Sequence, residues 1–100
     1  MKVELFSRYI DSVQARFGLS NSQMFGKKKQ QREYVDARQM LYLLCERSNI
    51  RVSYIKRYME EVGHKVTHTT IIHGIRRAKQ VMKEDKDYAT IVSNIEKDAV

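Results

Sequence analysis

The side chains best suited to molecular recognition form a short run of hydrogen-bonding groups at Thr67, His68, Thr69 and Thr70. Hydroxyl and imidazole groups donate and accept hydrogen bonds, and a threonine methyl can contact the methyl group of thymine. If this run begins a helix, the free backbone N–H groups of the first turn can also hold a phosphate. A second interpretation is that Thr67 or Thr69 only caps the helix, which is a frequent role of threonine. The two roles are compatible at one helix start.

Three histidines, His64, His68 and His73, raise the question of a metal site. His64 and His68 are four residues apart, but zinc normally takes three or four protein ligands. No Asp or Glu occurs between Val62 and Lys83 to complete such a set. Paired carboxylates, a serine–histidine arrangement and a GxxxxGK[ST] phosphate-binding loop are also missing from the sequence. We therefore expect a protein that is not an enzyme and that uses no metal, nucleotide or other cofactor.

Positive charge is concentrated in residues 1–83, which contain 17 Lys and Arg against 7 Asp and Glu. Residues 84–100 reverse this balance with 2 basic against 5 acidic residues, and the whole chain has a net charge of +7. A dense basic run spans residues 27–32, and the acid-free stretch that ends at Lys83 carries further basic residues, namely Lys65, Arg76, Arg77, Lys79 and Lys83. Such a surface attracts polyanions. The run 27–32 is predicted to be an exposed loop or a frayed helix start, and taken alone it is explained by solubility.

The hydrophobic pattern predicts an all-α fold, a compact bundle of about five to six helices in a single domain over residues 1–100. The chain lacks proline and has only four glycines, which permits long helices. Helices are predicted over 3–17, 33–48, 53–62, 67–83 and 86–100, with one short helical turn at 19–26. The side chains predicted to face the core include Val3, Val62 and Ile72. Ser53 is the predicted N-cap of the helix over 53–62, and Cys45 is predicted to be a buried hydrophobe.

Residues 53–83 predict a short helix, a break that contains Gly63, and a longer helix. This is the order of a helix-turn-helix, whose second helix enters the major groove and meets base edges with its N-terminal residues. Paired helices occur in any bundle, so the order alone is weak support. The polar run at 67–70 and the acid-free stretch behind it favour duplex DNA as the polyanion.

The chain resembles the C-terminal, origin-binding domain of the bacterial replication initiator DnaA, a helix-turn-helix domain of Trp-repressor-like type. The resemblance covers about residues 10–95 and rests on four segments in the same order. They are FGLS at 17–20 with MFG at 24–26, the basic loop, ARQM at 37–40, and THTTIIHG at 67–74. The family's signature at the last segment is Asp-His-Thr-Thr-Val-Leu-His-Ala.

The resemblance implies base contacts for His68, Thr69 and Thr70, and we add their neighbour Thr67. It implies that Lys29 or a neighbour enters the minor groove, and that residues at the start of the central helix grip phosphates. With the basic residues of the acid-free stretch, the expected contacts to the DNA backbone or minor groove are Lys27, Lys28, Lys29, Arg32, Arg38, Gln39, Lys65 and Arg76.

The sequence also departs from the family. Thr67 replaces the signature aspartate, Val66 replaces a basic residue, and Glu46 stands where the family has a lysine. These changes affect groups expected near the DNA, so the target sequence is expected to differ from the family's. The chain is expected to be a stand-alone reading domain, as found in a phage or a mobile element.

The expected function is sequence-specific binding of double-stranded DNA, with the helix-turn-helix (53–83) in the major groove and the basic loop (27–32) near the minor groove. The expected process is replication initiation or transcription control. The alternative is a protein-interaction module that modulates a host replication or transcription protein. The final acidic helix could pair with a second copy in a homodimer or shield the DNA-binding face. No signal peptide or membrane span is predicted, so the expected location is the bacterial cytoplasm or nucleoid, including that of a phage-infected host.

Overall fold

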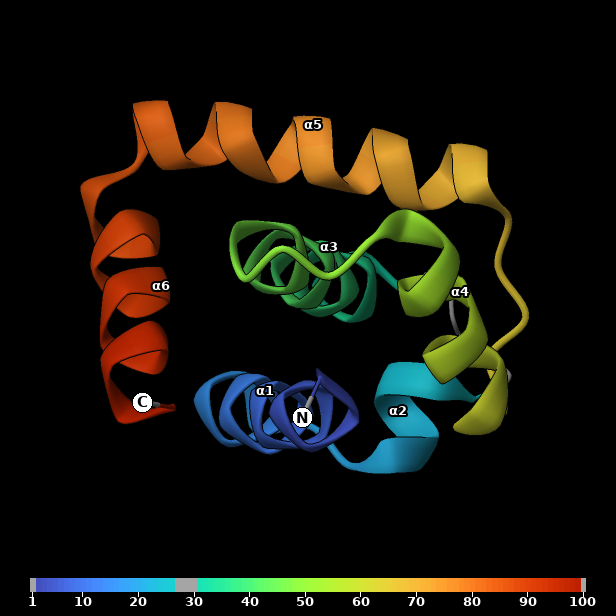
Figure 1. The fold of residues 1–100 in the computed structure, drawn as a ribbon. Helices are drawn as coiled ribbons and strands as arrows, with labels where there is room; N and C mark the ends of the chain where they lie inside the picture. The colour runs from blue at the N-terminus through green and yellow to red at the C-terminus, as the bar shows by residue number, and fades with distance from the viewer. Residues whose placement is uncertain (1, 27–30, 100) are drawn as a thin grey trace.

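The computed structural model describes residues 2–26 and 31–99, and every regular element in these ranges is a helix (Figure 1). The helices are α1 (Lys2–Phe17), α2 (Asn21–Phe25), α3 (Arg32–Arg47), α4 (Val52–Glu61), α5 (His68–Glu84) and α6 (Lys86–Asp98). The predicted all-α bundle of five to six helices is therefore confirmed. Most of the basic run, including Lys27, Lys28 and Lys29, lies outside the described residues, so its place in a loop stays a prediction.

Helix α3 lies at the centre of the bundle, between α1 and α5 (Figure 1). Its sequence is apolar around most of its girth, so it needs neighbours on several sides. Met40, Leu41 and Leu44 have no exposed surface, and neither has Cys45. Burial raises the pKa of the Cys45 thiol, which keeps it protonated and unreactive. Cys45 is thus a small buried hydrophobe, as predicted.

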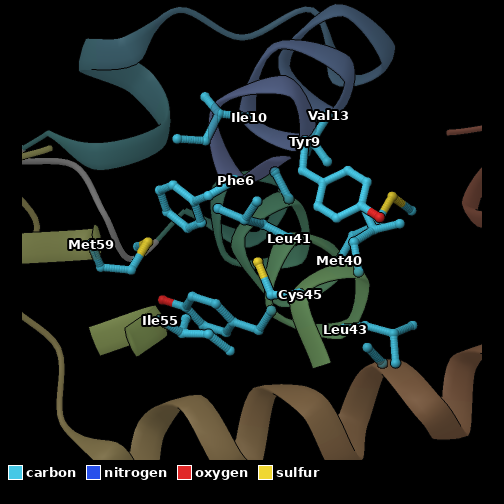
Figure 2. Packing of buried hydrophobic residues seen from close by; sticks show 14 of the residues in the cluster. Phe6, Tyr9, Ile10, Val13, Met40, Leu41, Leu43, Cys45, Ile55 and Met59 are labelled. Atoms are coloured by element: carbon cyan, nitrogen blue, oxygen red, sulfur yellow. The ribbon is translucent and has the colours of Figure 1, made fainter. Parts of the chain in front are cut away.

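Helix α1 covers one side of α3 with a stripe of apolar side chains. Figure 2 shows Phe6 and Tyr9 reaching from α1 toward Met40 and Leu41, with Ile55 and Met59 of α4 in the same cluster. The helix ends where predicted, because Gly18 adopts a φ of +68°, in the left-handed region that glycine enters without steric cost.

The short helix α2 also begins and ends where the sequence predicts. The Ser20 hydroxyl accepts a hydrogen bond from the Gln23 N–H, and the Gln23 side chain accepts one from the Ser20 N–H, which forms a capping box. Gly26 follows as the C-cap. Met24 and Phe25 are buried, as expected for a turn that docks on the core.

The two helices of the predicted helix-turn-helix begin differently from one another. For α5 the prediction is confirmed, since Thr67 is the N-cap and His68 the first helical residue. For α4 the predicted cap Ser53 is wrong. Arg51 is the N-cap, and its carbonyl accepts hydrogen bonds from Tyr54 and Ile55, so Ser53 lies within the first turn. The backbone geometry of Arg51 sets this start without a side-chain cap.

Three apolar residues predicted to face inward are exposed instead. Val3 is 44% exposed, Val62 is 40% exposed and Ile72 is 38% exposed. Successive helical residues are rotated by about 100°. The stripe of α5 that packs on the core is centred on Ile71 and Ile75, and this rotation carries Ile72 outside it.

A single residue, Asp85, joins the last two helices. Its side chain accepts hydrogen bonds from the N–H groups of Asp87 and Tyr88 at 3.0 and 3.1 Å, while its own N–H bonds to the Val81 carbonyl. Helix α6 therefore turns away from α5 and packs beside α1 and α3 (Figure 1). It lies at the end of α5 opposite His68, so in this structure it does not shield the polar run.

Candidate nucleic-acid interface

The first turn of α5 presents its polar side chains to solvent. Thr67, His68, Thr69 and Thr70 are all exposed. Thr67 Oγ1 accepts a hydrogen bond from the Thr70 N–H at 3.1 Å and donates one to Thr70 Oγ1 at 3.0 Å. The capping interpretation is therefore confirmed for Thr67. His68 and Thr69 follow on the same turn, and their outward position is compatible with contacts to a ligand.

A groove of about 530 Å³ runs beside this turn, between α3, α4 and the connection 62–67. It gathers five of the predicted site residues from two distant segments of the chain, namely Arg38, Gln39, Lys65, Thr67 and Thr70. The groove thus brings together the middle of the central helix and the start of α5.

Lys56 also lines this groove, although the sequence pattern did not single it out. Its ammonium lies 3.2 Å from a carboxylate oxygen of Glu60, one turn further along α4. The signal was present in the sequence, because Lys56 directly follows the core residue Ile55 and so lies on a flank of α4. Which flank faces α5 depends on how the two helices pack.

Arg38 differs from its expected role as a phosphate contact. Only 7% of its surface is exposed, and its guanidinium donates a hydrogen bond to the Met24 carbonyl near the end of α2. Burial lowers the pKa of this guanidinium. Arg38 therefore ties α2 to α3, whereas its neighbour Gln39, which also lines the groove, is partly exposed.

His64 lies at the base of the same groove and is 7% exposed. Its Nδ1 is 3.4 Å from the Phe25 carbonyl oxygen, and its ring meets the edge of the Phe25 ring. His64 therefore holds the end of α2 against the connection that precedes α5. No group of three or more His, Cys, Asp or Glu side chains able to hold a metal ion occurs among the described residues.

The basic run lies in the chain between the end of α2 and the start of α3. Its described flanks are Gly26, directly after the Phe25 that contacts His64, and Gln31, the N-cap of α3. Arg32 is exposed in the first turn of α3, 3.5 Å from Asp36. The predicted contacts Lys27, Lys28 and Lys29 lie outside the described residues.

Helix α5 lies unusually close to α3 at Gly74. A Cβ atom at this position would lie 2.8 Å from Cδ2 of Tyr42 and 3.3 Å from Cγ of Gln39. Tyr42 is 2% exposed, and burial raises its pKa to about 12. The absence of a side chain at Gly74 therefore sets the spacing between the two helices and keeps Gln39 within the same groove as Thr70.

The outer face of α5 continues the basic character of the connection. His73, Arg76 and Arg77 are exposed along it, and Ile72 adds an exposed aliphatic side chain. Lys79 lies to one side, where its ammonium pairs with Glu46 of α3 at 3.1 Å. The acid at position 46 thus neutralises one of the basic residues that the sequence had assigned to this face.

No protein-family model matches the chain. No solved structure matches it at a significant level either. No helix in the described part of the chain is long and apolar enough to cross a membrane.

Proposed function

We propose that the chain binds double-stranded DNA in a sequence-specific manner, with the first turn of α5 in the major groove. The observation that carries the proposal is the convergence of Gln39, Lys65 and Thr70 on one groove beside the exposed side chains of His68 and Thr69. Two segments that are distant in the chain thereby present hydrogen-bonding and cationic groups on one continuous surface.

The shape and charge of α5 support insertion into DNA. An α-helix with its side chains is about 10–12 Å wide, which matches the width of about 12 Å of the major groove. The helix carries no acidic residue from His68 to Lys83, so this length meets no like-charge repulsion from phosphates. His68 and Thr69 would then meet base edges, and Arg76, two turns further along the helix, would reach the backbone.

Contacts beyond α5 would fix its register on the duplex. Lys65 and Gln39 line the groove at the N-terminal end of α5, where the helix dipole also favours a phosphate. Arg32 and the basic run 27–29 would extend these contacts toward the neighbouring minor groove. Negative potential is enhanced there when the groove is narrow.

The resemblance to the DnaA origin-binding domain directs the proposed process toward replication initiation or transcription control, in the cytoplasm or nucleoid of a bacterium. Thr67 caps α5 in place of the signature aspartate, so a carboxylate is missing from the edge of the proposed reading surface. We therefore propose a target sequence of its own for this chain.

Selection from a pool of random duplexes on the purified protein tests the proposal. The expected result is an enriched consensus that the protein binds more tightly than a scrambled duplex of the same length. The Ser7→Ala protein, which lacks an exposed hydroxyl on α1 outside the groove, should select the same consensus as the unaltered protein. Absence of duplex binding at low salt would overturn the proposal. Binding without a consensus would remove its sequence-specific part and favour architectural DNA binding or the protein-interaction alternative.

A further inference from the structure

The outer flank of α4 carries an aromatic and basic surface that the groove does not use. Tyr54 is 37% exposed, and its ring stacks on that of Tyr58 with centroids 6.3 Å apart. The Arg57 guanidinium lies 5.5 Å from the centroid of the Tyr54 ring. Arg51 is exposed three residues before Tyr54, on the same side of the chain. We refer to Arg51, Tyr54, Arg57 and Tyr58 as the aromatic ridge.

The aromatic ridge faces away from the candidate DNA interface. Lys56 and Glu60 occupy the flank of α4 that lines the groove beside α5. Tyr58 lies on the other flank, where its ring is 5.2 Å from that of Phe6 in α1. A duplex that follows α5 and the groove would therefore leave the exposed Tyr54 uncovered. The aromatic ridge is therefore open to a binding partner other than DNA.

A second groove, of about 560 Å³, lies between α1 and α6. Asp87 and Asp98 line it near the two ends of α6, about 16 Å apart at a rise of 1.5 Å per residue. Ala15 and Ile91 supply apolar surface between them, and Arg16 lines the α1 wall. The ion pairs among the described residues engage Asp36, Glu46, Glu60 and Glu96, so within these residues Asp87 and Asp98 form no ion pair.

The two surfaces complement each other in charge, with two arginines on the ridge and two aspartates in the groove, and the helices α4 and α6 that carry them lie at opposite sides of the bundle (Figure 1). We propose that copies of this chain associate head to tail, with the aromatic ridge of one copy seated in the α1–α6 groove of the next. Tyr and Arg are the side chains most often found as interface anchors. The Arg51 and Arg57 guanidinium groups would pair with the Asp87 and Asp98 carboxylates, and complementary charges of this kind select partner and orientation.

The geometry of this contact determines the assembly. The ridge and the groove are different surfaces, so the interface is heterologous and leaves a free ridge at one end and a free groove at the other. Such a contact adds further copies in a row unless the rotation closes a ring. Helix α5 runs from the side of α4 to the side of α6 (Figure 1), so its outer face lies outside the proposed contact.

Sedimentation velocity without DNA tests the association independently of DNA binding. For the unaltered protein at low salt, the weight-average sedimentation coefficient should rise with concentration and fall as salt is added. Arg57→Glu and Asp98→Lys should each weaken the association about tenfold or more. Lysine at position 98 suits the C-terminal end of a helix, so this variant should fold normally. Arg77→Glu and Glu84→Lys make the same charge reversals at exposed positions outside both surfaces and should leave the association unchanged.

A mixture of the two variants tests whether the ridge of one copy meets the groove of another, rather than ridge meeting ridge or groove meeting groove. The Asp98→Lys protein retains an intact ridge, and the Arg57→Glu protein retains an intact groove, so an equimolar mixture should associate more tightly than either variant alone. A monomeric unaltered protein at all concentrations, or a mixture that stays monomeric, would overturn the proposal. Failure of the protein to bind DNA would not affect this result.

Discussion

Thr67 and Thr70 hydrogen-bond to each other through both a backbone and a side-chain contact, whereas His68 and Thr69 project outward from the same turn. This division separates two tasks at the start of α5. The Thr67 hydroxyl satisfies a backbone N–H that would otherwise lack a partner within the helix. The neighbouring side chains are then presented from a fixed backbone, which base recognition requires.

Replacing His68 or Thr69 with alanine should lower discrimination between the selected duplex and a random duplex by about 1–3 kcal/mol. The physical reason is the removal of hydrogen bonds or methyl contacts that only the correct base provides. Fluorescence anisotropy with both duplexes measures the two affinities. An equal decrease in affinity for both duplexes would show that these side chains only position the backbone.

Tyr42 supplies a second prediction at the residue scale. Burial in the folded chain raises the pKa of its phenol to about 12 from the ordinary value of 10.0, so the neutral phenol is preferred in the folded state. The contribution of Tyr42 to the free energy of unfolding is fully present below pH 10. It is lost as the pH rises from 10 to about 12, because the phenol ionises first in the unfolded chain.

Urea titrations between about pH 9 and 12 should therefore show the free energy of unfolding falling with pH. Burial also raises the pKa values of Tyr9 and Tyr88, so part of the fall should persist without Tyr42. Tyr42→Phe should give a shallower decline than the unaltered protein. An identical slope in both proteins would contradict the pKa assigned to Tyr42.

At the scale of elements, the packing of α5 on α3 decides where the first turn of α5 lies. Gly74 permits the close approach, and the Tyr42 ring fills the space that a side chain would take. The Lys79–Glu46 ion pair joins the same two helices further along α5. The position of Thr70 relative to Gln39 therefore depends on contacts that neither residue makes itself.

Gly74→Ala should destabilise the fold by about 1–3 kcal/mol, the usual cost of overpacking a core. Alanine forms helices better than glycine by up to about 1 kcal/mol, which opposes this effect. We expect the clash to prevail because Tyr42 is buried and its ring has little room to move. Thermal or urea unfolding measures the change, with Gln80→Ala on the exposed face of α5 as a control. A net gain in stability would show that α3 and α5 can separate without cost.

At the scale of the whole molecule, charge is distributed unevenly over the bundle. Helix α5 has no acidic residue from His68 to Lys83, whereas α6, which contains Asp87, Glu96 and Asp98, lies at the far end of α5 (Figure 1). We therefore expect a polyanion to approach on the side of α5 rather than on that of α6.

Replacing Lys27, Lys28 and Lys29 with alanine should weaken binding to all duplexes alike. It should also flatten the dependence of log affinity on log salt by about 0.9 for each phosphate that the variant no longer neutralises, because fewer counterions are released. The matched control replaces Lys2, Lys86 and Lys97, which removes the same charge at exposed positions outside the groove. An unchanged slope in the first variant would assign the basic run to solubility.

The order of residues is sufficient to specify the helices and most of their ends. Gly18, Ser20 and Thr67 act through contacts with residues at most five positions away, and such local contacts are visible in the sequence. The apolar girth of α3 likewise marks it as the central helix. The exposed turn at His68 and Thr69 was predicted on these grounds, and its role in binding DNA stays a prediction.

Helix packing, by contrast, determines which side chains share a surface. The sequence did not reveal that Arg38 turns inward to the Met24 carbonyl, because an arginine is usually exposed. It did not place Lys56 in the groove or pair Lys79 with Glu46, because these depend on the angle and distance at which helices pack. Local patterns specify the helices, while the surface that meets a ligand is set by packing between residues distant in the chain.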